Sequence, residues 1–255
     1  MAEAKKKKIV SASTGEEVKG TRKKATVKKQ AAPVGNATGL RVGAIILWVL
    51  ALAFEFLAWF VFIGKVNFTF LPSMVQLIAF LVLDLVCVII GSQLWKKANH
   101  IKPASEKNKT LFWLWNNMGV IVCAIAFVPF IILALTNKKA DKKTKAIATV
   151  AAIIALLIGG ATSIDYNPVS AEQQQAAMQT IEGKVLWAPF GKVYHMDETC
   201  QALNQSETLT EGTVEEAIAD GRTRLCAFCA KRNEVEGVVT DQNVDEVELE
   251  DTAEE

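Results

Sequence analysis

The chain has 255 residues, and 51% of them are hydrophobic. Its mean hydropathy is positive, which ordinary water-soluble domains rarely show, so the composition argues against a purely soluble protein. The net charge of +1 conceals an uneven distribution. Residues 1–41 contain eleven basic and three acidic residues, a balance of +8, whereas residues 164–255 contain six basic and twenty acidic residues, a balance of −14.

The first 41 residues form a basic arm that we predict to be disordered and cytoplasmic. Its lysines and arginines lie among Ala, Thr, Gly and Glu, which bury too little apolar surface to fold. No short apolar core with a cleavage site occurs in the arm, so we expect no secretory signal peptide. Anionic lipid headgroups attract a basic segment beside a membrane span by about 1 kcal/mol per residue. We therefore expect anionic lipids, in preference to nucleic acid, as the partner of the arm.

Four apolar stretches predict an all-α transmembrane domain over residues 42–164. They cover residues 42–63, 72–95, 111–135 and 146–164. Each is about as long as the roughly 17 to 25 residues that cross the hydrocarbon core of a bilayer as a helix. Small residues recur every three or four positions in the fourth stretch and predict close helix packing. These residues are Ala148, Ala152, Ala155 and Gly159.

Basic residues beside the spans indicate the orientation, because cytoplasmic loops are enriched in Lys and Arg. The arm and the loop 96–110 are basic, whereas the loop 65–71 contains one lysine. The loop after the third span carries five lysines although alternation places it outside, so one loop breaks the rule. The summed count favours a cytoplasmic amino terminus, and four spans then return the carboxyl-terminal part to the cytoplasm. A re-entrant third segment around Asn116, Asn117 and Pro129 would place that part outside.

Two carboxylates, Glu55 and Asp84, are the only charged residues within the four stretches. At about 1.5 Å rise per residue, antiparallel first and second spans place them at similar depth. One reading is a proton or ion pathway with a shared proton. The other reading is two neutral acids that hold helices together through hydrogen bonds to Gln76, Ser92 or Asn117. No Lys, Arg or His in the stretches completes a relay, which favours the second reading.

Three segments follow the last span. Residues 165–183 predict a polar, Gln-rich stalk, residues 184–233 a small α+β domain, and residues 234–255 a disordered acidic tail. Fewer than sixty residues cannot supply a large core. The small domain therefore needs another source of stability.

Local signals outline the small domain. Residues 184–195 predict two strands around a Pro-Phe-Gly turn. Thr213 and Glu216 have the spacing of a capping box at the start of a helix over residues 214–220, and Gly221 is suited to end it. The chain then returns to a second turn that contains two cysteines.

Four residues of the small domain have the spacing of a metal site: His195, Cys200, Cys226 and Cys229. They form H-x4-C and C-x2-C motifs separated by 25 residues. Three thiolates and one imidazole are a ligand set of structural, tetrahedral Zn²⁺. A disulfide or redox pair, which would leave one of the three cysteines over, and unreactive thiols are the alternatives.

The same region resembles a known family. The resemblance rests on four segments: Gly-Lys-Val-Tyr-His-x4-Cys, Glu-Gly-Thr-Val-Glu-Glu-Ala-Ile-Ala-Asp-Gly-Arg, Cys-x2-Cys, and Ile-Asp-Tyr-Asn-Pro-Val-Ser at 164–170. They look like uncharacterised bacterial multi-span membrane proteins with a carboxyl-terminal zinc-knuckle-like domain. The resemblance covers about residues 111–231 and implies the same four ligands but no activity. The tail is also similar to knuckles of some secreted nucleases and of a DNA-repair methyltransferase. That methyltransferase domain uses four thiolates, one of them reactive, so His195 here argues against methyl transfer.

These observations favour a membrane protein that presents a structural zinc knuckle for protein interaction or sensing. A site closed by four protein ligands leaves no position for a catalytic water, and no nucleophile or phosphate-loop motif occurs in the soluble part, so we expect no enzyme. The acidic charge of residues 164–255 repels nucleic acid. We expect a multi-pass protein of the plasma membrane with the knuckle in the cytoplasm. The alternative is a proton- or ion-coupled transporter that uses Glu55 and Asp84.

Overall fold

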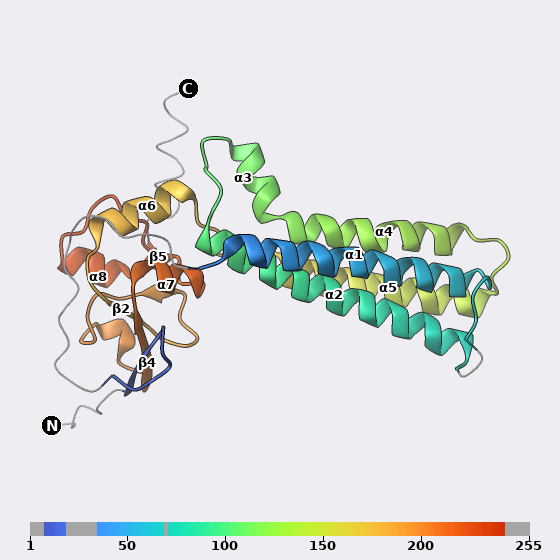
Figure 1. Ribbon diagram of the computed structural model, residues 1–255, viewed down its shortest axis with the longest axis horizontal. Helices are drawn as coiled ribbons and strands as arrows, with labels where there is room; N and C mark the ends of the chain where they lie inside the picture. Colours follow the sequence, from blue (N-terminus) through green and yellow to red (C-terminus); the bar gives the residue numbers. More distant parts are fainter. Residues whose placement is uncertain (1–7, 19–34, 69–70, 243–255) are drawn as a thin grey trace. The chain divides into compact units, whose positions relative to one another are not determined.

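The computed structural model describes residues 8–18, 35–68 and 71–242, which divide into two compact units (Figure 1). The helical unit comprises residues 37–98 and 109–166. The strand-containing unit takes the remaining described residues, including 99–108 and 167–242. Each unit has its own hydrophobic core.

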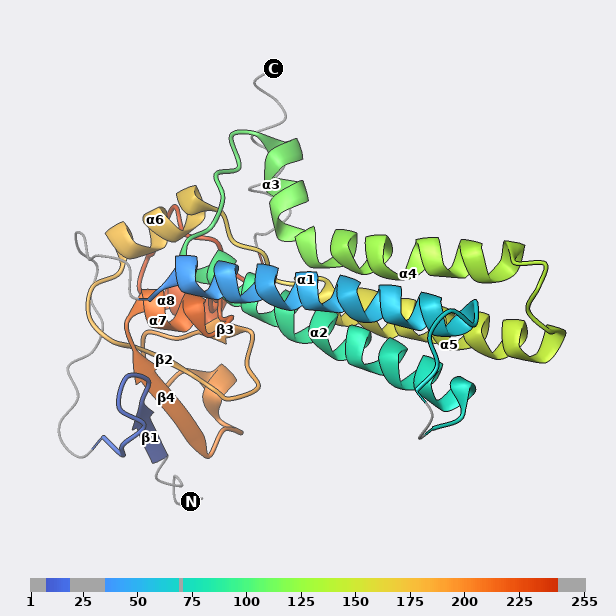
Figure 2. The ribbon, with the colours of Figure 1, turned by 45° about the vertical axis from the view of Figure 1, so that its right-hand side comes forward.

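Four long helices lie side by side in the helical unit (Figures 1 and 2). All four are long and apolar enough to cross a membrane, which confirms the number of predicted spans. Their bounds are α1, Ala37–Phe62; α2, Ser73–Ile101; α4, Met118–Thr136; and α5, Lys142–Ser163. The helices α1, α2 and α5 therefore begin or end several residues beyond the predicted apolar stretches, because polar residues extend a helix after it leaves the apolar run.

Large apolar side chains cover the outside of this bundle. On α1, for example, Ile46, Val49 and Phe56 are each about 60% exposed. Water would make such a surface unfavourable by roughly 25 cal/mol per Å² of apolar area, whereas a lipid environment satisfies it. The outward-facing apolar residues thus agree with the membrane-spanning character of the helices.

The predicted third span, residues 111–135, is wrong in its first part. Lys109–Asn116 form a separate helix, α3, whose axis diverges from that of α4 (Figure 2). Asn117 separates the two helices, and its side-chain amide donates to the carbonyl of Trp113 at 2.9 Å. Helix α4 then continues through Pro129 to Thr136. By itself, α4 is long and apolar enough to cross a membrane.

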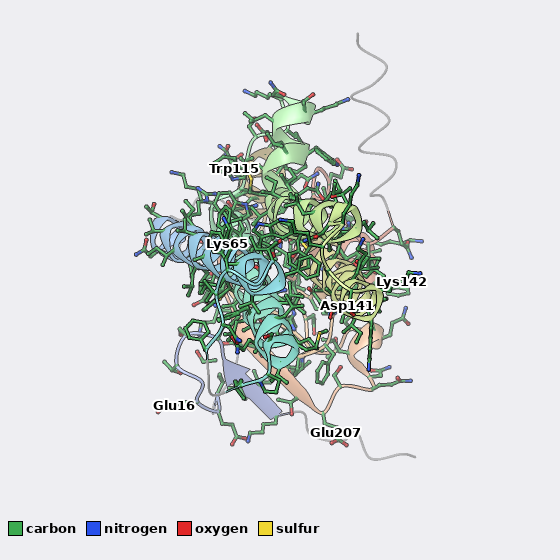
Figure 3. All side chains as sticks on the ribbon, turned by 90° about the vertical axis from the view of Figure 1, so that its right-hand side faces the viewer. Glu16, Lys65, Trp115, Asp141, Lys142 and Glu207 are labelled. Carbon is green, nitrogen blue, oxygen red and sulfur yellow. The ribbon has the colours of Figure 1, made fainter. Side chains whose placement is uncertain are left out.

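Small residues let α4 and α5 pack closely, as the sequence predicts. Ala148, Ala152, Ala155 and Gly159 are all buried. A Cβ atom added to Gly159 would lie only 2.8 Å from Cys123 Sγ on α4, so a larger residue there would force the helices apart. At its first turn, α5 is capped by Asp141, the residue before Lys142 (Figure 3). The Asp141 carboxylate accepts hydrogen bonds from the backbone N–H groups of Lys143 and Thr144.

The strand-containing unit has two small sheets. The first has the order β1-β4-β2, with β1, Lys8–Ser11; β4, Thr208–Gly212; and β2, Val185–Trp187. The second pairs β3, Val193–Tyr194, with β5, Arg224–Leu225, in parallel. The helices of the unit are α6, Ala171–Thr180; α7, Val214–Ala219; and α8, Ala227–Arg232, with a 3₁₀ turn at Gln201–Leu203.

Local sequence signals placed most of these elements correctly. Strands β2 and β3 flank the predicted turn and are joined by a bridge between Leu186 and His195. Helix α7 starts at the predicted capping box, in which Thr213 accepts from the Glu216 N–H and Glu216 accepts from the Thr213 N–H. Gly221 follows it with a φ of 85°, which glycine adopts without strain. The Gln-rich segment after the last span forms α6, capped by Ser170.

The expectation of a wholly disordered arm is wrong for residues 8–18. Strand β1 pairs in parallel with β4, which brings Ile9 opposite Leu209. The expected lack of structure after residue 233 is also wrong for Val238, which is 5% exposed within the core. The remaining parts of both predictions, residues 1–7, 19–34 and 243–255, lie outside the described residues.

Candidate metal centre and buried acid pair

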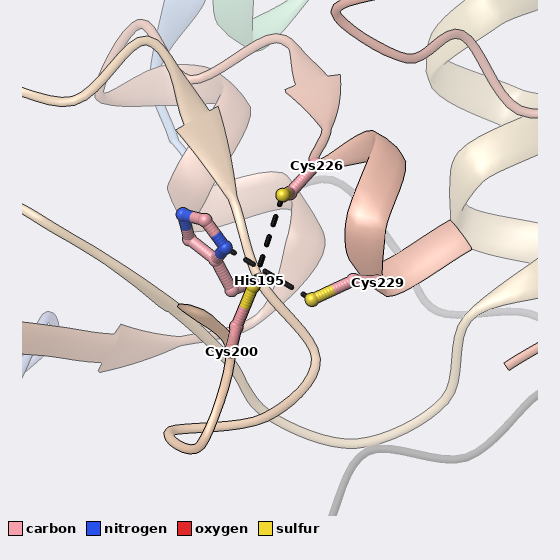
Figure 4. Close-up of side chains that lie close together, drawn as sticks. All are labelled: His195, Cys200, Cys226 and Cys229. Carbon is pink, nitrogen blue, oxygen red and sulfur yellow. Dashed lines mark hydrogen bonds between the residues drawn. The ribbon is translucent and has the colours of Figure 1, made fainter. Parts of the chain in front are cut away.

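The four predicted metal ligands converge in the strand-containing unit (Figure 4). His195 follows β3, Cys200 precedes the 3₁₀ turn, Cys226 precedes α8, and Cys229 lies within α8. All four side chains are buried, and their ligand atoms lie within 4.8 Å of one another. The structure thus brings together both halves of the motif across 25 intervening residues.

The distances fit a tetrahedral site. Cys200 Sγ and Cys226 Sγ are 3.9 Å apart, and Cys229 Sγ lies 3.9 Å from His195 Nδ1. A tetrahedron with metal–sulfur bonds of about 2.3 Å separates its sulfurs by about 3.8 Å. All five cysteines of the chain are free, so the disulfide alternative does not describe this arrangement. The Nδ1 atom of His195 is the imidazole nitrogen directed at the sulfurs.

Burial raises the pKa of the Cys200 thiol, whereas the backbone hydrogen bond to its sulfur lowers it. Backbone N–H groups of Ala202, Met196 and Cys229 hydrogen-bond to the sulfurs of Cys200, Cys229 and Cys226, respectively. The contact with Cys229, supported by His195, lowers the pKa of the Cys226 thiol to about 3. The same contact raises the pKa of Cys229. A cation placed among these groups would favour the charged form of all three sulfurs.

The backbone around the ligands is held by hydrogen bonds. The Cys226 N–H donates to the Tyr194 carbonyl at 2.9 Å, which ties the two halves of the motif together next to the site. Asn233 donates from its side chain to the Cys229 carbonyl at 2.7 Å. The Asp241 carboxylate accepts from the Ala227 N–H at 2.8 Å. Asn233 and Asp241 were missed by sequence reasoning, because no local pattern connects either residue with the cysteine turn.

A hollow in the surface borders the site. Its lining combines one aromatic ring, two basic side chains and the backbone turn of the first motif, and consists of Thr199, Cys200, Gln201, Phe228, Lys231 and Arg232. The Phe228 side chain is 48% exposed. Arg232 also lies 3.6 Å from the Asp197 carboxylate, which leaves Lys231 as the more accessible cation of the hollow.

Comparisons with known proteins identify no relative. No protein-family model matches the chain, and neither a curated protein nor a solved structure resembles it significantly.

Glu55 and Asp84 meet inside the helical unit. Glu55 on α1 is 9% exposed and Asp84 on α2 is fully buried, and their carboxyl groups lie close enough to interact. The hydrogen-bond partners that we expected for the two acids make their hydrogen bonds to other groups. Gln76 contacts Asn67 and backbone carbonyls, and Ser92 bonds to Ser163 at 2.9 Å.

Proposed function

We propose that the chain is a multi-pass membrane protein that carries a zinc-stabilised, knuckle-like domain for protein interaction or sensing. One observation supports this most directly. His195, Cys200, Cys226 and Cys229 are buried, and their ligand atoms lie within 4.8 Å of one another. Buried polar groups with no role cost free energy, so the convergence of four ligand atoms in one place favours a bound ion.

The chemistry of the ligands favours zinc in a structural role. Thiolate and imidazole ligands suit Zn²⁺, whereas Mg²⁺ and Ca²⁺ prefer oxygen. Three sulfurs and one nitrogen complete a tetrahedron without a position for water, so Lewis-acid catalysis at the metal has no open site. We therefore propose a structural site and no enzymatic activity.

The metal would connect chain segments that are far apart in the sequence. The first pair of ligands follows β3 and the second pair surrounds the start of α8. Small domains with limited cores gain folding free energy from such a link, because the ion binds only when both segments are in place. Strand β1 and Val238 extend the same core, so the domain is larger than the predicted residues 184–233.

Contacts within the strand-containing unit support the proposed orientation. Strand β1 pairs with β4, and the Ala171 N–H donates to the Ala104 carbonyl at 3.0 Å. Segments before α1, after α2 and after α5 therefore belong to one folded unit and would lie on one side of the membrane. This arrangement requires an even number of spans. With the basic arm inside, we propose that this side is the cytoplasm of a cell bounded by its plasma membrane, with the arm contacting anionic lipids.

We propose the hollow beside the site as the surface for the protein partner. An exposed aromatic ring next to Lys231 fits an acidic segment that carries an apolar side chain. A synthetic peptide of residues 243–255 has this chemistry, with seven acidic and no basic residues. It should bind a chain truncated after Gln242 and should bind the Lys231→Glu variant of that chain at least tenfold more weakly. If the peptide bound the truncated chain and its Lys231→Glu variant equally well, or bound neither, the hollow would be excluded as the partner surface.

Elemental analysis of the full-length chain, purified in detergent, tests the metal. The proposal predicts one zinc ion per chain. Cys226→Ser should reduce the bound zinc by at least half, whereas the matched variant Cys87→Ser, in α2, should retain it. A parent protein without stoichiometric metal would end the proposal.

A further inference from the structure

We propose that Glu55 and Asp84 form a proton-binding site within the membrane-spanning bundle and hold one proton between them. Both side chains are at least nine-tenths buried, and their carboxyl groups lie close enough to interact. Among the described residues, Glu55 Oε2 and both Asp84 oxygens have no hydrogen-bond partner. The ligand of this site is the proton itself.

Geometry favours a proton over other ligands. A hydrogen bond between two carboxyl groups needs a hydrogen atom on one of them, since two carboxylates have only acceptors. Two like charges in one apolar site also strongly oppose each other, so such pairs share a proton. A metal cation would need several oxygen ligands, whereas this site brings together two carboxyl groups.

Groups on the neighbouring helices leave the pair without a counter-ion. Cys87 on α2 and Cys123 on α4 lie near Asp84, and a cysteine side chain carries no positive charge. On α5, the buried Thr149 hydroxyl offers no charge. The apolar stretches of the four spans contain no Lys, Arg or His. Within the described part of the bundle, the proton is therefore the positive charge that can offset the two carboxylates.

Loss of the proton would change the packing of the bundle. Release of one proton to water leaves two carboxylates in contact, and the pair holds α1 next to α2. Mutual repulsion then favours separation of the helices or entry of water between them. Protonation and the spacing of α1 and α2 are thus coupled, so any motion that hydrates the pair releases a proton, and protonation restores the closed bundle.

Carboxyl NMR of the full-length protein in lipid nanodiscs tests the site. Selective ¹³C labelling of the Asp and Glu carboxyl carbons distinguishes a protonated carboxyl from carboxylates in the unmodified protein. At neutral pH the proposal predicts one protonated carboxyl per chain, lost in Glu55→Gln/Asp84→Asn. The matched variant Glu182→Gln, an exposed acid of the other unit, should keep it.

Two results would overturn the proposal. One is a parent protein with every carboxyl ionised at neutral pH, a measurement that does not depend on whether the variant folds. The other is an unchanged protonated signal in the double variant, which would assign the proton to another residue. Zinc content is a separate readout, so failure of this site leaves the metal proposal untouched.

Discussion

The Asp241 carboxylate accepts a 2.8 Å hydrogen bond from the backbone N–H of Ala227. Ala227 is the first residue of α8, the helix that carries Cys229. A carboxylate at the start of a helix satisfies one of the N–H groups that have no partner within the helix and interacts favourably with its dipole. A residue 14 positions downstream therefore fixes the start of the C-x2-C helix.

Replacement of this cap should weaken the metal site. Asp241→Ala should destabilise the strand-containing unit by about 1 kcal/mol, the usual effect of losing a helix cap, and should increase the rate at which a chelator removes zinc. Asp241→Asn keeps an accepting oxygen, so its stability and its rate of zinc removal should be much closer to those of the parent protein. Equal chelation rates for all three proteins would show that the cap does not support the site.

Strand β1 should contribute to the stability of the same unit. Ile9 is partly buried against its core and lies opposite Leu209. Ile9→Ala should lower the free energy of unfolding by about 2 kcal/mol, at the low end for a large-to-small change because the side chain is not fully buried. Hydrogen exchange of residues 208–212 would measure the effect, with Ile9→Val as the mild control. Unaltered protection in Ile9→Ala would mean that β1 is dispensable.

The contact between α6 and the loop that joins α2 to α3 should depend on pH. Burial raises the pKa of Glu172, but hydrogen bonds from the Ser105 hydroxyl and the Glu106 N–H outweigh it, so the pKa is lower than the usual value. A lowered pKa in the folded state stabilises the contact above the unfolded pKa of about 4.5, and this stability is lost as the pH falls through the folded value. The protection of residues 102–107 against hydrogen exchange, relative to the intrinsic rate at each pH, should therefore fall in acid.

Glu172→Gln separates this effect from acid release of the metal. At neutral pH the variant should show faster exchange in residues 102–107 with its zinc content unchanged. Parent-like exchange in Glu172→Gln would indicate that the carboxylate does not hold the loop.

The proposed orientation predicts which loops are accessible from outside the cell. Native cysteines are buried, so an introduced cysteine reports its own position. An impermeant maleimide should label Lys139→Cys, beside α5, on intact cells. It should label Glu182→Cys, in the strand-containing unit, only after lysis. The reverse pattern would place the metal domain outside.

Local and non-local features differ in how far the sequence predicts them. The membrane helices and the capping box at Thr213 depend on residues close together in the chain, and composition or spacing identifies them. The metal ligands form two short motifs, each recognisable by its own spacing. The start of the predicted third span was wrong because the apolar and aromatic residues of α3 continue the apolar run of α4, although α3 is the less apolar of the two helices. Hydropathy alone therefore does not show the break at Asn117.

Features built by distant segments required the structure. Strand β1 is a four-residue strand in a basic arm, and only pairing with β4, about 200 positions away, stabilises it. The Asp241 cap and the burial of Val238 also depend on the fold around them. The similar depth of Glu55 and Asp84 was predicted from the helical rise, whereas the interaction between them depends on how α1 and α2 pack.

X-ray absorption at the zinc edge of the purified full-length protein tests the central claim most directly. We predict one zinc ion per chain, with three sulfur ligands at about 2.3 Å and one nitrogen ligand at about 2.0 to 2.1 Å. A first shell of oxygen ligands, or a protein without bound zinc, would contradict the assignment of His195, Cys200, Cys226 and Cys229 as a metal centre.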